Sequence, residues 1–423
     1  MSSGKGPLTM APEPPLRTSG DKYFPLMREY GIYVFLLLMF GGRFGTFREI
    51  GLYLPAFLWL FQGITRGKFE LVWREPLCIG ILALFLSAVV ASFSSTTPLN
   101  SLLLLKKEYL KILLLYLVIS TTFVQSEKLK RLAFFIALVG IVYLIAGFYR
   151  IGADLIKAGA INYDETRYYA TVFLFFFSFF LLQNICTKGL KRVLWTIAVI
   201  GSTAGILLIG VRGSWLALFG TVCLWIYFLK ERSKNIITVL KVGIPAILVV
   251  IISVFILFPG QFKMIREHTT QKVQMSLRLE TWNIFLIMAK DRLLIGHGID
   301  DGAMRDRFHE EFRRLRGEEP AEETQPTTPH NQFIKMLYQQ GIVGLMLYCA
   351  LFVVFVYRTV NTFHMRREGS PRFVGIAVLS AIIGEYVIRC LTEDRSLIPL
   401  GFLLGMAGAY VNLPKENKDE EKG

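Results

Sequence analysis

Apolar runs recur along the whole chain and are separated by short polar or basic connections. Most of these runs approach the roughly 20 residues that an α-helix needs to cross the hydrocarbon core of a bilayer. The pattern therefore predicts an all-α integral membrane protein with about 12 transmembrane helices. The predicted spans cover residues 30–41, 50–62, 77–93, 108–124, 132–152, 168–185, 193–210, 214–229, 239–258, 332–357, 372–389 and 396–412.

One long polar segment, residues 259–331, interrupts this pattern before the last three predicted spans. Within it, residues 277–295 mix apolar and polar positions, as a helix lying at the membrane surface does, and residues 308–319 are strongly charged. The expected organisation is a disordered cytoplasmic tail (1–22), transmembrane helices 1–9 (23–258), a long periplasmic loop carrying surface helices (259–331), transmembrane helices 10–12 (332–412) and a second cytoplasmic tail (413–423).

Composition and charge support the membrane assignment and set the orientation. Of the 423 residues, 53% are hydrophobic, and the mean hydropathy is +0.48. A net charge of +15 would suggest a nucleic-acid partner for a soluble protein, but here Lys and Arg concentrate in alternate connections, where they fix topology, so no nucleic acid is expected. The basic connections are residues 66–74, 128–131, 188–192, 230–234 and 358–372. They place the N-terminus in the cytoplasm and residues 259–331 in the periplasm.

Three arginines on the expected periplasmic side are candidate ligands for an anion. Arg212 lies in a tight turn between two apolar runs, where a charge is costly unless it meets an anion or a water-filled cavity. Its planar guanidinium suits phosphate, although an arginine that reaches lipid headgroups is the alternative. Arg278 begins the surface helix, where an ordinary salt bridge to Glu280 or Glu267 is the alternative, and Arg167 could be a simple charge at a helix end.

His330 and Asn331 directly precede the tenth predicted span. A histidine there is placed where a cavity in the helix bundle would open to the periplasm, although it could instead cap the helix. Gly341 and Gly344 follow in the same helix, where small residues let a neighbouring helix approach closely.

In this combination the sequence resembles the O-antigen ligase family and its relatives, the O-antigen polymerases. The resemblance covers residues 201–347, whereas the first half of the chain matches only in its hydropathy. It rests on the His330–Asn331 pair, the nine-residue gap to Gly341, and on Gly344, Arg212 and Arg278, the last upstream of Gly296 and Gly298.

The resemblance implies a glycosyltransferase of the bacterial inner membrane that moves polysaccharide from undecaprenyl pyrophosphate to the lipid A core oligosaccharide in lipopolysaccharide biosynthesis. Arg212 and Arg278 would bind the pyrophosphate, with Arg167 as a third cation, and the active site would face the periplasm. His330 would be the catalytic general base, because a neutral imidazole can take the proton of an acceptor hydroxyl, and Asn331 would support it. With one base and no carboxylate nucleophile evident, we expect a single displacement that inverts the anomeric carbon.

No cofactor or metal is expected, because fixed cations can stabilise a pyrophosphate leaving group. The string that starts at His309 has Arg313 where a zinc-binding HExxH motif needs its second histidine. Asp300 and Asp301 are adjacent carboxylates, but the glycines around them fit a turn better than a metal site.

Two other functions stay open from the sequence. An O-antigen polymerase would extend the same carrier-linked glycan on a different acceptor. A polysaccharide or lipid transporter would line a path with arginines and cut nothing, but its charges would more typically lie deep in paired, interrupted helices. Membrane lipids are expected partners under every interpretation.

Overall fold

The computed structural model describes residues 20–41, 45–65, 74–229, 272–317, 328–366, 369–393 and 395–414, with short pieces between residues 245 and 263. These residues form helices and no β-strand, so the predicted all-α class is confirmed. The elements in chain order are α1 (Gly20–Leu38), α2 (Gly45–Thr65), α3 (Pro76–Phe93), α4 (Pro98–Lys107), α5 (Tyr109–Thr122), α6 (Ser126–Ala158), α7 (Tyr163–Cys186), α8 (Gly189–Ile209), α9 (Arg212–Phe228), α12 (Lys272–Lys290), α13 (Asp301–Arg316), α14 (Gln332–Met365), α15 (Ser370–Ile382), the π-helix η5 (Ile383–Ile388), the 3₁₀-helix η6 (Arg389–Leu391) and α16 (Ile398–Val411).

The predicted apolar runs fall on these helices, except that residues 239–258 lie mostly outside the described part of the chain. Six of the described helices are long and apolar enough to cross a membrane, so a multi-pass membrane protein is supported while the count of about twelve spans is not confirmed. The expected surface segment and the charged run after it are helices α12 and α13. Most of the two expected tails, 1–22 and 413–423, lies outside the described residues.

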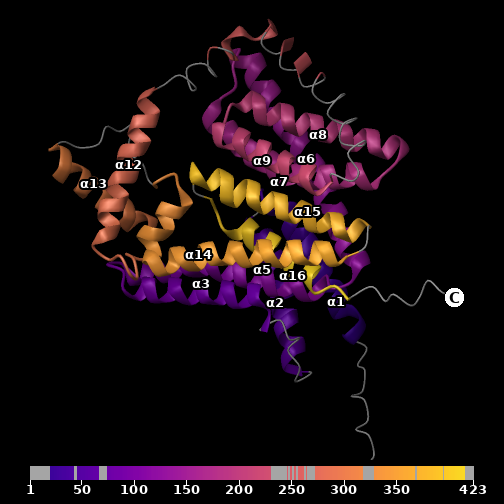
Figure 1. The fold of residues 1–423 in the computed structure, drawn as a ribbon, viewed down its shortest axis with the longest axis horizontal. Helices are drawn as coiled ribbons and strands as arrows, with labels where there is room; N and C mark the ends of the chain where they lie inside the picture. Colours follow the sequence, from indigo (N-terminus) through magenta and orange to yellow (C-terminus); the bar gives the residue numbers. More distant parts are fainter. Residues whose placement is uncertain are drawn as a thin grey trace, which may run out of the picture.

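The helices form two packed groups joined by α15. In one group α5 lies along α16 and α3 along α14, and in the other α7 packs between α6 and α8 (Figure 1). Helix α15 contacts α7 in the second group as well as α14 and α16 in the first. Helices α12 and α13 lie beyond one end of the bundle, beside the start of α14 (Figure 1). That end of the bundle holds the predicted site.

Small residues explain how closely α5 and α16 pack. A Cβ added at Gly401 would lie 2.6 Å from the Cα of Ile112, and one at Gly405 would lie 2.8 Å from the Cβ of Ile119. Inside a bilayer the hydrophobic effect does not drive two helices together, so association relies on van der Waals contact, and glycine stripes of this kind let backbones approach.

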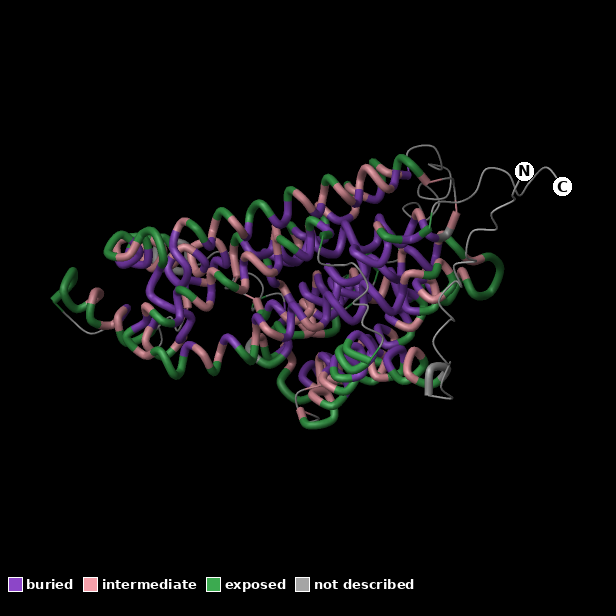
Figure 2. Tube along the Cα trace, turned by 90° about the horizontal axis from the view of Figure 1, so that it is seen from below, coloured by how far each residue is buried: buried purple, intermediate pink, exposed green. Residues whose placement is uncertain are grey.

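The outer surface of α6 shows what the bundle faces. Buried residues lie at the centre of the molecule, and exposed residues lie on its outside (Figure 2). On α6 the exposed side chains include a continuous apolar stripe with helical spacing, formed by Phe134, Leu138, Val142, Ile145 and Tyr149. A soluble protein rarely exposes such a stripe, whereas contact with lipid accounts for it.

Candidate active site

The turn before α14 holds His330 in an unusual backbone conformation. Its φ of 48° makes it the only non-glycine residue with positive φ among the described residues. Such a conformation costs on the order of 1–3 kcal/mol and recurs at functional sites. Asn331, rather than His330, caps the helix: its Oδ1 accepts hydrogen bonds from the backbone N of Phe333 at 3.0 Å and of Ile334 at 3.1 Å. The capping role considered for the histidine therefore belongs to its neighbour.

Two contacts fix this turn between α12 and η6. The indole Nε1 of Trp282, on α12, donates to the carbonyl of Pro329 at 2.8 Å. On the other side, Nδ2 of Asn331 donates to the carbonyl of Leu391 at 3.0 Å. The histidine is thus held at the junction of α12, the end of η6 and the first turn of α14.

Arg278 reaches the same junction from α12. Its Nη1 donates to the carbonyl of Thr392, one residue after η6, at 3.3 Å. The salt bridge to Glu280 that the sequence left open does not form, because Glu280 accepts from Nε of Arg316 at 2.7 Å instead. The hydrogen bond of Arg278 is therefore to a neutral carbonyl.

Arg212 is the first residue of α9, whose next residue, Gly213, lies against Thr392. The tight turn predicted there is present, since Gly210 ends α8 in the left-handed region with φ of 82°. A Cβ on Gly213 would lie 2.3 Å from Oγ1 of Thr392, so the start of α9 can meet this residue because glycine stands there. The side chain of Arg212 is exposed.

Arg167 is not joined to these residues by any described contact. It lies exposed near the start of α7, and α7 packs against α9 and η5. Arg167 therefore belongs to the same helix group as Arg212, while Arg278 and the chain neighbours of Arg212 and His330, namely Gly213 and Asn331, contact Leu391 and Thr392.

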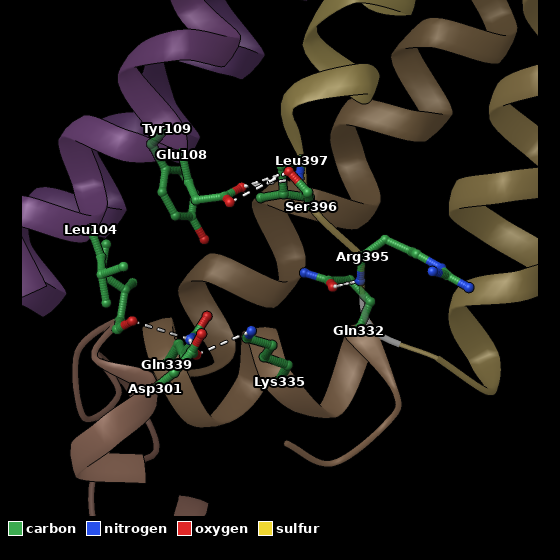
Figure 3. A pocket seen from close by; sticks show the side chains of 11 residues that line it. Leu104, Glu108, Tyr109, Asp301, Gln332, Lys335, Gln339, Arg395, Ser396 and Leu397 are labelled. Carbon is green, nitrogen blue, oxygen red and sulfur yellow. Dashed lines mark hydrogen bonds and ion pairs between the residues drawn. The ribbon is translucent and has the colours of Figure 1, made fainter. Parts of the chain in front are cut away.

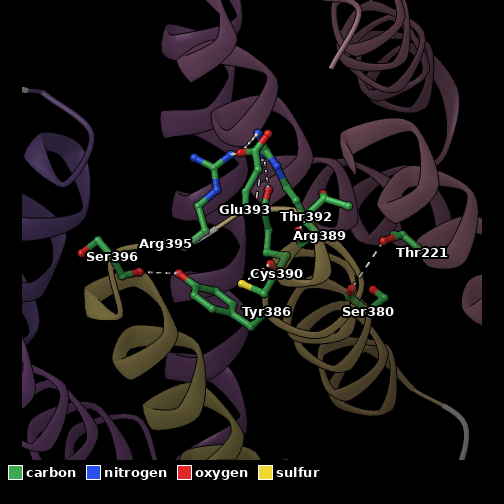
Figure 4. A network of polar contacts seen from close by, with 10 residues as sticks. Thr221, Ser380, Tyr386, Arg389, Cys390, Thr392, Glu393, Arg395 and Ser396 are labelled. Carbon is green, nitrogen blue, oxygen red and sulfur yellow. Dashed lines mark hydrogen bonds and ion pairs between the residues drawn. The ribbon is translucent and has the colours of Figure 1, made fainter. Parts of the chain in front are cut away.

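A buried charged network beside Thr392 was missed in the sequence (Figure 4). Arg389 is fully buried, and its guanidinium lies 3.3 Å from a carboxylate oxygen of Glu385 and 3.3 Å from one of Glu393. Arg395 also pairs with Glu393. The sequence does contain a pattern that indicates this network: Glu385, Arg389 and Glu393 are spaced four residues apart at the end of an apolar run. Charges in such a run are costly unless they pair with one another.

The backbone of α14 bends at Gly341, which has φ of 68° and ψ of −168°. There the backbone N of Ile342 donates to the carbonyl of Leu293 at 2.7 Å. A Cβ on Gly341 would lie 2.3 Å from the carbonyl oxygen of Leu294, and one on Gly296 would lie 2.4 Å from that of Gln339. The predicted close approach at Gly341 is present, but its partner is the segment after α12 rather than a neighbouring helix.

A cavity of about 240 Å³ lies beside the first turns of α14 (Figure 3). Gln332, Lys335 and Gln339, on one face of the helix, line it. A different face of α14, with Ile334 and Tyr338, packs on the apolar cluster of α12 and α13. The first turns of α14 thus separate the packed helices α12 and α13 from a polar cavity.

The two adjacent aspartates have partners of their own. Asp300 caps α13 through Oδ1, which accepts from the backbone N of Gly302 at 2.9 Å, and its Oδ2 accepts from Oγ1 of Thr97 at 2.7 Å. Asp301 pairs with Lys335 at 3.1 Å. Within the described ranges, no group of three or more His, Cys, Asp or Glu side chains is arranged to hold a metal ion.

The fold and the site together define a class: a multi-pass helical membrane protein that gathers a histidine and several arginines at one end of its bundle. Residues 197–349 match the family model described as O-antigen ligase, and the segment includes Arg212, Arg278 and His330. The match supports the O-antigen ligase family for this part of the chain, and that family implies a membrane enzyme of the O-antigen ligase or polymerase type with lipid-linked glycan substrates. No curated protein matched the chain.

Proposed function

We propose that the protein is an O-antigen ligase, which moves polysaccharide from undecaprenyl pyrophosphate to the lipid A core oligosaccharide at the periplasmic face of the bacterial inner membrane. The observation that carries the proposal is the meeting of Arg278 and the start of α9 at Thr392, beside the His330–Asn331 turn. All three predicted site residues of this junction lie within the segment that matches the family.

The proposed reaction is a single displacement. The imidazole of His330 takes the proton of an acceptor hydroxyl while that oxygen forms a bond to the anomeric carbon of the donor glycan. The bond from this carbon to the pyrophosphate oxygen breaks, and its electron pair leaves with undecaprenyl pyrophosphate. Attack opposite the leaving group inverts the anomeric carbon.

The arginines stabilise the negative charge that grows on the pyrophosphate as the bond breaks. Arg278 and Arg212 are the direct ligands, and Arg167 is a supplementary cation on α7. A guanidinium suits this role because its donors match two phosphate oxygens at once and its charge does not depend on pH. Stabilising the developing charge in this way removes the chemical need for a metal ion at the leaving group.

The polymerase remains the second candidate, because the family model covers ligase and polymerase-type enzymes alike. Donor chemistry would be the same, and only the acceptor would differ. A transporter is less well supported, because the predicted site residues of the junction gather at one end of the bundle, and a protein that only transports would have no use for a histidine as a base there.

The deciding experiment gives purified protein a carrier-linked glycan together with lipid A core oligosaccharide and separates the products by gel electrophoresis. We expect glycan to appear on the lipid A core, at the same rate with and without EDTA. Lengthening of the carrier-linked glycan alone would assign a polymerase, and unchanged substrates would favour transport. Loss of transfer in EDTA that Mg²⁺ or Mn²⁺ restores would contradict the metal-independent mechanism.

A further inference from the structure

The cavity beside α14 has a lining suited to a sugar. It contains both carboxylates and donors: Asp301 and Glu108 can accept from hydroxyls, while Lys335, Gln339 and Arg395 can donate (Figure 3). Leu104 contributes an apolar wall. A concave site with a few convergent polar groups and an apolar side is the usual form of a small-ligand pocket.

The charges in this cavity balance one another, which argues against an anionic ligand. Nζ of Lys335 lies 3.1 Å from Oδ1 of Asp301, and the same oxygen accepts from Nε2 of Gln339 at 3.1 Å. Arg395, at another edge of the cavity, pairs with Glu393. A phosphate would have to displace these carboxylates, whereas neutral hydroxyl groups can share the existing donors and acceptors.

Hydrogen bonds connect the lining of the cavity to the turn that holds His330. Oε1 of Gln332, which lines the cavity, accepts from the backbone N of Arg395 at 3.1 Å. Asn331, the preceding residue, binds the carbonyl of Leu391 in the same segment. Leu391 and Thr392 therefore lie at the arginine junction and Arg395 lies at the cavity, and the start of α14 contacts both.

We infer that this cavity binds a sugar residue of the acceptor glycan and so presents its hydroxyl toward His330. The inference rests on the proposed transfer reaction and assigns the acceptor to a place separate from the pyrophosphate site. A single displacement needs such a separation, because acceptor and leaving group occupy opposite sides of the anomeric carbon.

The test measures binding without requiring transfer. Core oligosaccharide released from its lipid is titrated into detergent-purified protein, and its dissociation constant is measured for the wild type and two cavity variants. Lys335→Met removes a charged donor, and Leu104→Trp fills the cavity while keeping the Lys335–Asp301 pair. The matched control is Lys157→Met, since Lys157 is exposed at the end of α6, away from the cavity lining.

We expect binding to weaken about 10-fold or more in both cavity variants, the size of a lost hydrogen bond to a charged group, and to stay unchanged in the control. Affinity for the carrier-linked glycan should be unaffected in all three. No binding by the wild type, equal binding by all variants, or displacement of the oligosaccharide by equimolar inorganic phosphate would overturn the acceptor site. If binding follows the expected pattern but the wild type transfers nothing, the proposed function fails and the saccharide site stands.

Discussion

The two regions on either side of the first turn of α14 differ in how their charges are arranged. At the junction around Thr392, Arg278 donates to a backbone carbonyl, and no carboxylate among the described residues bonds to it. In the cavity, Lys335 lies directly against Asp301. The first arrangement retains positive charge for an incoming anion, and the second offers mixed donors and acceptors to a neutral ligand. A transferase that separates an anionic leaving group from a sugar acceptor needs one region of each kind.

The junction and the cavity are also held together by different kinds of contact. Glycine at position 213 lets α9 approach Thr392, so the junction depends on close backbone contact between elements distant in sequence. The cavity depends on side chains, since Asp301 at the start of α13 is held by Lys335 and Gln339 of α14. Substitutions should therefore separate the two regions by their effects on donor, acceptor and stability.

The largest expected effect is a loss of transfer rate on substitution of His330, which precedes the first turn of α14 between the two regions. His330→Ala should slow single-turnover transfer by about 10² to 10⁴, as loss of a general base does, while carrier binding stays near the wild-type value. His364→Ala, an exposed histidine at the far end of α14, is the matched control. If His330→Ala abolishes carrier binding and leaves the rate of bound substrate unchanged, the histidine is a ligand of the pyrophosphate and the division between the regions is wrong.

A smaller loss of turnover is expected from substitutions of the arginines at the junction. Arg278→Ala and Arg212→Ala should each weaken carrier binding and reduce turnover together, by roughly 10- to 100-fold, because each removes a charged donor from the pyrophosphate. Lysine at either position should restore part of the loss, since it keeps the charge without the two-point contact. Carrier affinity and single-turnover rates test this, with Arg305→Ala on exposed α13 as the control. If these variants instead raise the KM for the acceptor and bind the carrier normally, the arginines contribute to acceptor binding and not to the pyrophosphate site.

Much of the junction could be predicted from the sequence, because the signals are local. The His330–Asn331 pair before an apolar run, the turn at Arg212 and the surface helix with Arg278 are each visible within a few residues. Their meeting at Thr392 could not be predicted, because it depends on packing between α9, α12 and the segment after η6. Single-sequence patterns report periodicity along one element and carry no information on which elements touch.

The buried network and the cavity could not be predicted from the sequence for a related reason. Arg389 was counted within an apolar run, and the π-helix before it, which alters the side-chain register, has no simple sequence signature. The cavity is lined from α4, α5, α13, α14 and the segment before α16, so no single stretch of the chain outlines it. Gly341 illustrates the intermediate case: its need for close approach was predictable, but its partner was not.

The bend at Gly341 lets α14 contact the segment after α12, and its loss should have a moderate effect. Gly341→Ala places a side chain at φ of 68° and against the carbonyl of Leu294, so it should destabilise the fold by at least about 1–2 kcal/mol. Thermal unfolding in detergent measures this, and acceptor binding should weaken with it. Gly152→Ala in α6, where an added Cβ meets nothing within 4 Å, should be neutral or stabilising. Equal unfolding temperatures for Gly341→Ala and the wild type would show that α14 can straighten without cost.

The smallest expected effect is a pH dependence of stability that originates away from both regions. His297 is buried, stacks on Tyr338 of α14 with ring centroids 4.8 Å apart, and its Nε2 lies 2.8 Å from the carbonyl oxygen of Met288. Burial, and then the charges of Arg307 and Arg292, lower its pKa from the ordinary value of 6.5. A folded state that disfavours the charged imidazole binds fewer protons than the unfolded chain.

The stability contributed by this neutral histidine is therefore fully present above pH 6.5 and is lost as the pH falls through the lowered pKa of the folded state. The unfolding temperature of the wild type should drop on acidification more than that of His297→Gln, which cannot titrate. Any change of turnover on acidification should be the same in both proteins, because His297 is not one of the proposed site residues. If the two proteins lose stability in parallel, His297 does not couple proton binding to folding. If only the wild type loses activity, acid inhibition acts through the packing of α12 on α14 rather than through the base between the two regions.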